Sequence, residues 1–315
     1  MMIGNSGRTS GRFAAWSVAQ AVCLAASSLP AFAGWQEDVG TFRVGIVAEP
    51  GSGNGIAGLG TLNDAFAKAL GVKVEFLVAR SYPALIDAQV SARIDYAVYS
   101  AAAYAAAYER CGCVEPLVAP TDESGALGIR SIMVTMDGRL ASTSDLAGRR
   151  IALLPPDSMA GHQLPLASFS PNGRRLSGEE NFFVAVQSAE AAEAMLMEGA
   201  VDAIFGWEPA GPAGSGEIEG GTLQRLVAAG VDPAALSVVW RSDVLRYGPH
   251  AVSTTLDPEP RKRLATFLTG LRQSDPVLYE TLETRHLGGF APASQADYAA
   301  ALAIVRSLAG ASDQE

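Results

Sequence analysis

The chain has 315 residues, which suffices for one large or two medium domains, and its formal net charge is −10. This acidic balance argues against nucleic acid and anionic membranes as partners, because both would be repelled. Only three histidines and three cysteines occur, so no metal site and no cofactor is expected.

Residues 1–33 have the parts of a secretory signal peptide. Arg8 and Arg12 form the positive end, a mostly apolar stretch follows, and Ala31-Phe32-Ala33 is an A-x-A cleavage site. The alternative, a transmembrane anchor, is disfavoured by the serines, glutamine and proline within the apolar stretch. We expect cleavage near Ala33, which changes the net charge to −12, and a soluble, monomeric protein in the periplasm.

The first half of the remaining chain alternates apolar strands with helices. Strands are predicted over 42–48, 72–77 and 94–99, and helices over 60–70, 83–92 and 101–108. This order predicts right-handed crossovers and a parallel sheet. Ligands of such sheets bind outside the carboxyl ends of the strands. Four polar side chains lie at such ends: Ser52, Tyr82, Tyr99 and Ser100. Taken singly, each tyrosine is more commonly a partly buried core ring.

Two cysteines follow the signal peptide, Cys111 and Cys113, with one residue between them. An exported protein meets an oxidising compartment, so we expect a local disulfide between them. A ring closed across one residue is strained, which makes such a bond easier to reduce. A free pair and half of a metal site are the alternatives.

The stretch from Arg149 to Phe169 is the strongest candidate for a binding loop. A short apolar strand ends at two prolines, and Asp157 or Ser158 can then cap a helix that is predicted to run to Phe169 with a kink at Pro165. The free N–H groups of a first helical turn can hold an anion. Taken alone, this stretch fits an ordinary strand-to-helix connection better, since the pattern recurs in most α/β folds.

The second half repeats the alternation. An extended segment is predicted over 126–136, strands over 182–186, 201–205 and 236–241, and helices over 188–198, 258–271, 276–282 and 294–308, with a glycine-rich loop over 211–221. The most economical α/β architecture has two lobes, each a mostly parallel sheet flanked by helices, joined by two crossover strands. Lobe one comprises 34–128 plus 237–315, and lobe two comprises 129–236. A ligand would lie in the cleft between them, and hinge motion would close it.

Four segments of the chain resemble one protein family in order and spacing. They are YPALIDAQVSARIDYAVYSAAAY, AGRRIALLPPDSMAGHQLP, SAEAAEAMLMEGAVDAIFG and SVVWRSDVLRYGPHAV. The family is that of the substrate-binding proteins of phosphate, phosphite and phosphonate ABC transporters, and the resemblance covers nearly the whole chain after the signal peptide. It implies the type II periplasmic binding-protein fold.

The resemblance also implies a binding site. Tyr82 and Tyr99 match family tyrosines that face the ligand, and Ser158 retains one hydroxyl of the family's Ser-Thr-Ser loop. Met159 and Ala160 replace the other two hydroxyls, and Ala189 replaces a family histidine. The expected ligand-binding residues are Tyr82, Tyr99, Ser100, Ser158, Met159, Ala160, Gly161 and Trp207. A second group comprises Ser52, His162, Ser188, Glu208 and Tyr247.

Two features of the sequence allow more than one class of ligand. N–H groups of the loop from Met159 to Gly161, with His162 nearby, would hold an oxyanion differently from the family pattern. Trp207, Glu208 and Met159 would suit a ligand with an apolar or cationic part, although Trp207 is equally well explained as a packing residue.

Three classes of function remain. The first is a periplasmic receptor that passes a small oxyanion to an ABC permease in the inner membrane. The second is a sensor for a membrane kinase or chemoreceptor, which would use the same receptor lobes. The third is a binder or enzyme of the same fold for another small organic molecule, but no nucleophile with a base stands out in the sequence. We therefore expect a receptor and not an enzyme.

Overall fold

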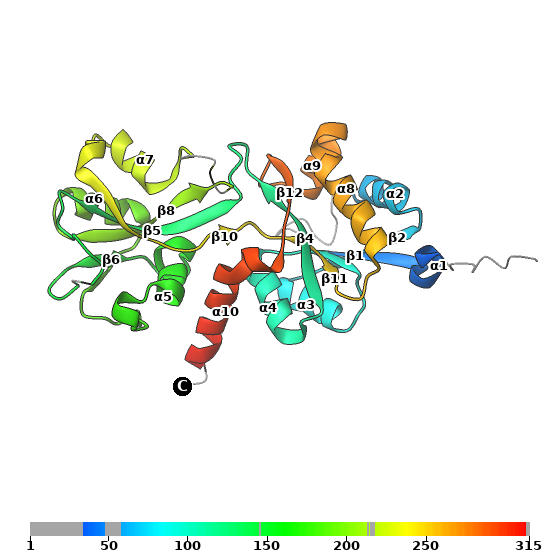
Figure 1. Cartoon of the computed structure of the whole chain (residues 1–315), viewed down its shortest axis with the longest axis horizontal. Coiled ribbons are helices and arrows are strands. Elements are labelled where there is room, and N and C mark those ends of the chain that lie inside the picture. Colours follow the sequence, from blue (N-terminus) through cyan, green and yellow to red (C-terminus); the bar gives the residue numbers. More distant parts are fainter. Residues whose placement is uncertain (1–33, 48–57, 145, 213, 215–217, 313–315) are drawn as a thin grey trace, which may run out of the picture. The chain divides into compact units, whose positions relative to one another are not determined.

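The computed structural model describes residues 34–47, 58–144, 146–212, 214 and 218–312 (Figure 1). The predicted signal peptide, its cleavage site and Ser52 lie outside the described residues. Trp35–Glu315 forms one compact unit that contains two six-stranded sheets. Among the described helices, none is long and apolar enough to cross a membrane.

The first sheet, which we call sheet A, is built from strands at both ends of the unit. In spatial order its strands are β12 (Gly289–Pro292), β4 (Val114–Thr121), β11 (His250–Ser253), β3 (Tyr96–Val98), β1 (Thr41–Val47) and β2 (Lys73–Ala79). The helices before, between and after these strands are α1 (Trp35–Val39), α2 (Leu59–Leu70), α3 (Tyr82–Val90), α4 (Ala101–Cys111), α8 (Pro258–Ser274), α9 (Pro276–Leu282) and α10 (Ala299–Ser312), which follows a 3₁₀ turn over Gln295–Tyr298.

The second sheet, sheet B, is built from the middle of the chain. Its strands are β10 (Leu245–Arg246), β5 (Gly128–Met136), β8 (Ala203–Ala210), β6 (Ile151–Leu153) and β7 (Phe183–Ala185), with β9 (Leu236–Arg241) also paired to β5. Its helices are a π-helical turn (Met159–Gln163), α5 (Leu164–Ser168), α6 (Ala189–Met197) and α7 (Gly221–Ala228), with 3₁₀ turns over Pro171–Gly173 and Pro233–Ala235. α6 and α7 lie over one face of this sheet (Figure 1).

Both sheets are mixed, which corrects the expectation of mostly parallel sheets. In sheet A only β1 with β2 and β1 with β3 are parallel, and in sheet B only β6 with β7 and β6 with β8 are parallel. The remaining pairs are antiparallel. The parallel pairs are the predicted strand–helix–strand units, while the antiparallel strands include those that bring the chain into each sheet and out of it.

The chain passes between the two sheets twice. The chain passes from sheet A to sheet B between β4 and β5, close to the predicted first crossover. It returns between β10 and β11, so the predicted boundary at 236/237 was wrong for the second crossover. The predicted segment 236–241 is β9, which pairs along β5 from Met136 to Ile132 and therefore belongs to sheet B.

The helix predicted from Met159 to Phe169 is present over 159–168, but its first half is a π-helix. Ser158 caps a π-helical turn of five residues, and α5 continues for five more with Pro165 in its first turn. Proline is tolerated there because a first-turn N–H has no intrahelical partner.

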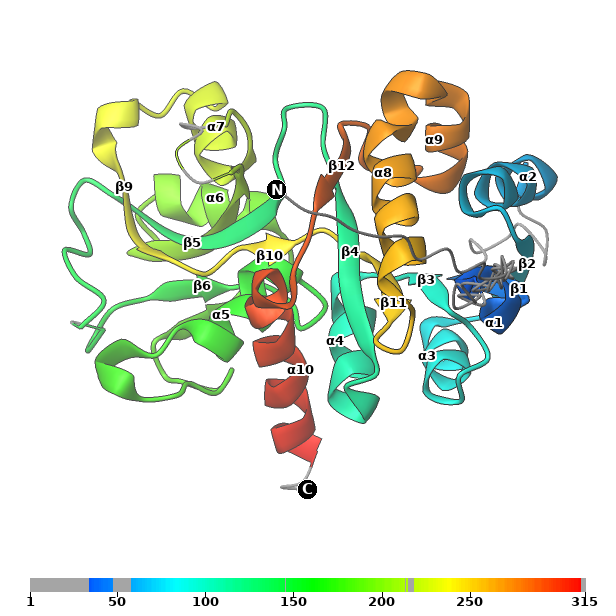
Figure 2. The same cartoon turned by 45° about the vertical axis from the view of Figure 1, so that its right-hand side comes forward.

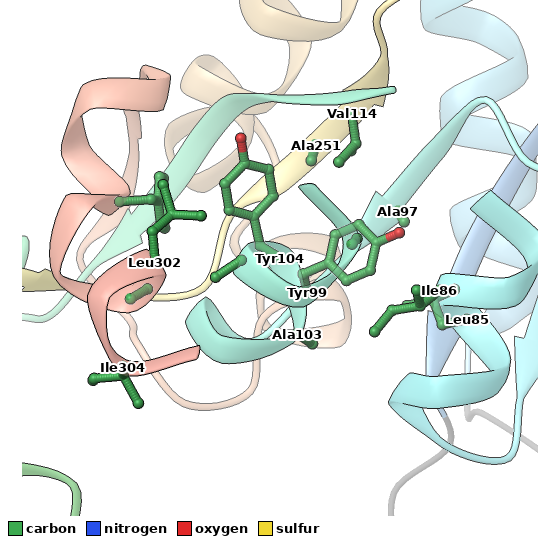
Figure 3. Packing of buried hydrophobic residues seen from close by; sticks show 14 of the residues in the cluster. Leu85, Ile86, Ala97, Tyr99, Ala103, Tyr104, Val114, Ala251, Leu302 and Ile304 are labelled. Atoms are coloured by element: carbon green, nitrogen blue, oxygen red, sulfur yellow. The ribbon is translucent and has the colours of Figure 1, made fainter. Parts of the chain in front are cut away.

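Hydrophobic packing links helices that are far apart in the sequence. Tyr104 of α4 packs against Tyr298 with 4.8 Å between ring centroids, and α10 runs beside α4 (Figure 2). The same cluster contains Tyr99, Leu85, Leu302 and Ile304 (Figure 3). Leu164 of α5 also belongs to it, so a helix that follows a strand of sheet B packs on a core formed mainly around sheet A.

Candidate functional site

A pocket of about 190 Å³ lies beside sheet B, on the side of α6 and α7. Its inner wall is Leu154, just after β6, and the segment from Ile204 to Trp207 of β8. Three further segments complete it: the turn that Ser158 caps, the first two turns of α6 and the first two turns of α7. The pocket is the candidate functional site.

Ser158 begins the first of these segments. Its side-chain oxygen accepts a hydrogen bond from the Gly161 N–H at 3.2 Å, which leaves the hydroxyl proton for another acceptor. Ser131 of β5 donates its hydroxyl to the Ala160 carbonyl at 2.6 Å and holds the turn against the sheet. Gly161 is required here, since a Cβ atom would lie 2.7 Å from the Leu154 side chain.

The second segment is the start of α6. Ser188 is the N-cap, and its oxygen accepts a hydrogen bond from the Ala191 N–H at 3.2 Å. Ala189 follows and lines the pocket. One turn further, Glu193 also lines it, although the residue is only 8% exposed. A buried carboxylate needs a charged or donating partner.

That partner is Arg225, in the third segment. Its Nε and one terminal nitrogen both donate to Glu193 Oε1, at 2.9 and 2.6 Å. The same terminal nitrogen lies 3.2 Å from Thr222 Oγ1, and the guanidinium carbon lies 6.0 Å from the centre of the Trp207 ring. The Trp207 N–H also donates to Thr222 Oγ1, at 3.0 Å. Thr222 therefore accepts two hydrogen bonds and keeps its own proton to donate.

The close approach of α7 to β8 depends on two glycines. A Cβ atom at Gly206 would lie 2.3 Å from Thr222 Oγ1. At Gly221 it would lie 2.2 Å from the Trp207 carbonyl oxygen, and the backbone φ of +75° also favours glycine. Both glycines let Thr222 and Arg225 approach the strand that forms the inner wall.

The assembled pocket offers donors of several kinds to a small anion. The Ser158 and Thr222 hydroxyls can each donate a proton, and the first turns of α6 and α7 contribute the partial positive charge of a helix N-terminus. Arg225 adds a guanidinium whose positive charge is paired with the Glu193 carboxylate. Among the described residues, no group of three or more His, Cys, Asp and Glu side chains is arranged to hold a metal ion.

The pocket brings together four of the residues expected from the sequence. Ser158, Ala160, Gly161 and Trp207 all line it. Met159, between them in the chain, instead packs against the hydrophobic cluster around Tyr99. Trp207 lines the pocket, and its ring centre lies 6.0 Å from the guanidinium carbon of Arg225.

The expected residues near sheet A lie elsewhere. Tyr99 is 3% exposed, its hydroxyl lies 3.5 Å from Gln89 Oε1, and burial raises its pKa well above the ordinary value (Figure 3). Ser100 is the N-cap of α4 and accepts a hydrogen bond from the Ala103 N–H at 3.2 Å. Tyr82, the first residue of α3, is partly buried against the same cluster as Tyr99. Tyr99 and Ser100 therefore have structural partners of their own.

The remaining expected residues also have partners. His162 Nδ1 lies 2.7 Å from the Leu154 carbonyl oxygen, which holds the ring beside the loop. Glu208 was expected just after a strand, but it lies within β8 and pairs with Arg241 at 2.8 Å. Tyr247 lies between the sheets, with its hydroxyl 3.3 Å from Asp122 Oδ2, and burial raises its pKa to about 12.

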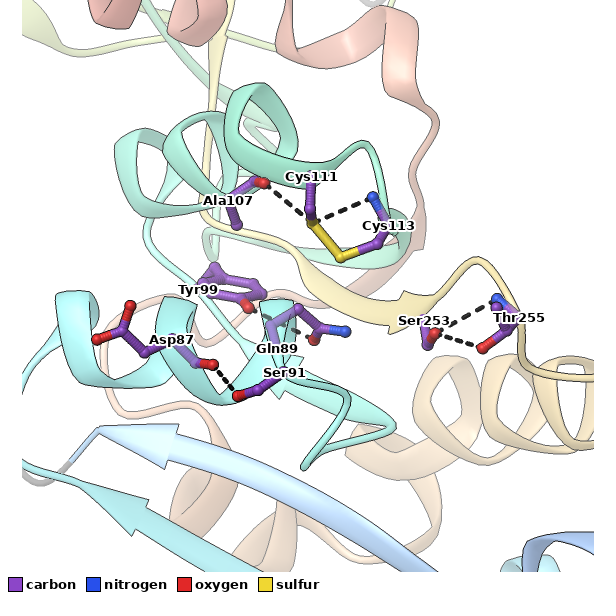
Figure 4. The surroundings of a disulfide bond; sticks show 9 residues. All are labelled: Asp87, Gln89, Ser91, Tyr99, Ala107, Cys111, Cys113, Ser253 and Thr255. Carbon is purple, nitrogen blue, oxygen red and sulfur yellow. Dashed lines mark hydrogen bonds between the residues drawn. A yellow bond between two sulfur atoms is a disulfide. The ribbon is translucent and has the colours of Figure 1, made fainter.

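Cys111 and Cys113 are joined by a disulfide in the structure (Figure 4). The bond links the last residue of α4 to the residue before β4, across Gly112 with its positive φ. Cys111 Sγ also lies 3.4 Å from the Ala107 carbonyl oxygen. The bond is remote in sequence from the residues that line the pocket. It connects the end of α4 to the start of β4, which belongs to sheet A.

The sequence interpretation missed Glu193, Thr222 and Arg225. Thr222 was next to a region assigned as a glycine-rich loop, and α7 was not predicted. The sequence offered one signal, a short amphipathic pattern that places Thr222 and Leu226 on the same helix face. Both residues are buried in the structure. Glu193 was within a predicted helix, but only the fold shows that its side chain meets Arg225.

Ser188 can be tested as a structural cap. We expect Ser188→Ala to lower the free energy of unfolding by about 1 kcal/mol, because the Ala191 N–H loses its acceptor. Denaturant unfolding measures the change, with Ser237→Ala at an exposed position of β9 as the control, for which we expect less than about 0.5 kcal/mol. Equal stability of the two variants would contradict the capping role.

Comparison with known proteins agrees with this architecture. The family described as the periplasmic substrate-binding protein of phosphonate ABC transporters matches residues 45–298. The chain is 26% identical over 208 residues to the phosphate-import protein PhnD of Mycolicibacterium smegmatis, and the match covers 63% of this chain and 62% of that protein.

Two solved structures resemble the chain to different degrees. One is a binding protein component of an ABC phosphonate transporter from Pseudomonas aeruginosa, with 19% identity, a TM-score of 0.40, and coverage of 82% of this chain and 83% of that one. The other is transferrin 1 from Manduca sexta, with 13% identity, a TM-score of 0.57, and coverage of 86% of this chain and 46% of that one. The match over residues 45–298 spans most of the sequence. The chain belongs to the family of periplasmic substrate-binding proteins of phosphonate ABC transporters and has a type II periplasmic binding-protein fold.

Proposed function

We propose that this protein is a periplasmic receptor that captures a small phosphorus oxyanion, of the phosphate, phosphite or phosphonate type, and delivers it to the permease of an ABC importer. The observation that carries this proposal is the pocket beside sheet B, where Ser158, Thr222 and Arg225 can all donate hydrogen bonds to one small anion. Family membership supports the same class of ligand.

Local donors have to work against the charge of the whole protein. The chain carries a formal net charge of −10, so the long-range field repels an anion. Two neutral hydroxyls, the starts of α6 and α7, and one guanidinium supply short-range attraction where the ligand would be partly removed from water. A receptor built in this way needs no catalytic group, and no chemical step is required of it.

We also propose that the strands of sheet A and sheet B belong to two lobes that close on the ligand. The chain passes between the sheets twice, in the short segments between β4 and β5 and between β10 and β11. Two short connections are suited to hinge motion. On this proposal Tyr82 and Ser100, at the starts of α3 and α4, would complete the ligand's surroundings from the other lobe.

Calorimetric titration of the purified protein tests the proposed ligand class. We expect phosphate, phosphite or methylphosphonate to bind, and Thr222→Val to weaken binding roughly 10-fold, because one hydroxyl donor is lost while side-chain volume is kept. Ser237→Ala, at an exposed position of β9 that does not line the pocket, should leave affinity unchanged.

Two results would contradict the proposal. If none of the phosphorus oxyanions binds while an aromatic or cationic metabolite does, the ligand class is wrong. If the bound ligand is recovered chemically changed, the protein acts as an enzyme and not as a receptor alone.

A further inference from the structure

The carboxylate of Glu193 is unusual in a pocket that otherwise presents donors. Both hydrogen bonds that Glu193 accepts from the described residues go to Oε1, from Nε and a terminal nitrogen of Arg225. Oε2 accepts none from the described residues, and it is not among their buried polar atoms without a partner. Since Glu193 lines the pocket and is 8% exposed, Oε2 is left for whatever the pocket contains.

We propose that Glu193 Oε2 accepts a hydrogen bond from the bound oxyanion, so that the pocket selects a tetrahedral anion that carries a proton. This inference rests on the proposed function. Hydrogen phosphate and a hydrogen phosphonate present a P–O–H group that can donate to Oε2. Sulfate and methanesulfonate have the same shape and outer oxygens but no proton at neutral pH, so an anionic oxygen would face the carboxylate.

The proposed selectivity rests on the repulsion between two hydrogen-bond acceptors, Glu193 Oε2 and an unprotonated oxygen of the ligand. Where a site is built to hydrogen-bond one group of its ligand, an analogue that lacks the group leaves buried polar atoms unpaired and is strongly rejected. Here the mismatch also sets two negative oxygens side by side, in a pocket that is partly shielded from water. Arg225 can donate its remaining N–H groups to other oxygens of the ligand, but it does not supply the donor that Oε2 lacks, because its bonds to Glu193 go to Oε1.

The charge balance points the same way. The Glu193–Arg225 pair contributes no net charge, so the remaining attraction comes from hydroxyls and helix N-termini, which suits an anion of low charge. A ligand that keeps one proton has both the lower charge and the donor that Oε2 lacks. Glu193 is thus a specificity-determining residue.

Competition between methylphosphonate and methanesulfonate provides the test. The two ligands are compared by calorimetry at about pH 6, where the phosphonate keeps a P–O–H group and the sulfonate has none. For the unmodified protein we expect methylphosphonate to bind at least about 100-fold more tightly. This comparison needs no variant and already tests the inference.

Glu193→Gln tests the residue itself. Its amide oxygen can still accept from Arg225, and its amide nitrogen can donate to a sulfonate oxygen. We expect methanesulfonate to gain at least about 10-fold in affinity and the ratio of the two affinities to fall below about 10. Glu190→Gln is the matched control, because it removes the same charge from an exposed position at the start of α6.

The outcomes distinguish the role of Glu193 from the receptor function itself. Equal binding of both ligands by the unmodified protein, or a ratio that Glu193→Gln leaves unchanged, overturns the role of Glu193 while the receptor function stands. The same fall in the ratio for Glu190→Gln would show an effect of general charge and would also overturn it. Failure of every phosphorus oxyanion to bind overturns the proposed function and this inference together.

Discussion

Gly206→Ala is expected to destabilise the protein by about 1–3 kcal/mol and to weaken oxyanion binding roughly 10- to 100-fold. The new methyl group would lie 2.3 Å from Thr222 Oγ1 and 2.7 Å from Thr222 Cβ, so the start of α7 has to move away from β8. That movement breaks the Trp207 N–H bond to Thr222 and displaces Arg225 from the pocket. Denaturant unfolding and calorimetric titration measure the two losses.

Gly60→Ala is the matched control for this substitution. Gly60 lies in the first turn of α2, and a Cβ atom there meets nothing within 4 Å. We expect it to stabilise the protein by up to about 1 kcal/mol and to leave binding unchanged, because alanine favours a helix over glycine. A Gly206→Ala protein with normal stability and affinity would show that contact between α7 and β8 does not shape the site.

Acid is expected to destabilise the protein through His250 of β11. This side chain is fully buried, Tyr96 hydrogen-bonds to its Nδ1, and its Nε2 is buried without a partner among the described residues. Burial lowers its pKa from 6.5 to about 4, although the nearby Glu283 charge acts in the opposite direction. In the unfolded chain the pKa returns to its ordinary value.

The sign of the pH effect follows from these two pKa values. Above pH 6.5 neither state binds the proton, so His250 contributes no pH dependence. As pH falls from 6.5 to about 4 the unfolded state is protonated first, and stability falls by about 3 kcal/mol in all. The loss levels off below pH 4, where the folded state also binds the proton.

Unfolding free energies measured from pH 7 to pH 4 test this expectation against a His250→Gln variant. Between pH 7 and pH 4 the free energy of unfolding of the variant should fall by about 3 kcal/mol less than that of the unmodified protein, since glutamine does not titrate there. An NMR titration of His250 with a midpoint near 6.5 in the folded protein would contradict the account. Glu283 adds acid sensitivity to both proteins, because its own pKa is lowered.

Local sequence patterns predicted most of the fold. The strand–helix–strand units around β1 to β3 and the runs that form β6, α6 and β8 follow apolar periodicity and caps such as Ser100 and Ser188. Ser158 was also predicted as a cap, and its side chain lines the pocket. Such features depend on residues a few positions apart, so a single sequence is enough to indicate them.

Long-range pairing was harder to predict. β9 reads as an isolated apolar run, and only its pairing with β5, about a hundred positions earlier, assigns it to sheet B. The contact of Glu193 with Arg225 likewise joins two helices across 32 positions, and no local rule couples these two residues. For Tyr99 a local pattern was misleading. Its position at the end of a strand suggested ligand contact, but its ring packs against Tyr104 in the core.

A crystal structure of the protein grown with methylphosphonate would test the central claim most directly. We predict electron density for the phosphonate in the pocket beside sheet B, within hydrogen-bond distance of the Ser158 and Thr222 hydroxyls, with one oxygen facing Glu193 Oε2. Density elsewhere, with this pocket filled only by water, would contradict the assignment of the site and of the residues proposed to form it.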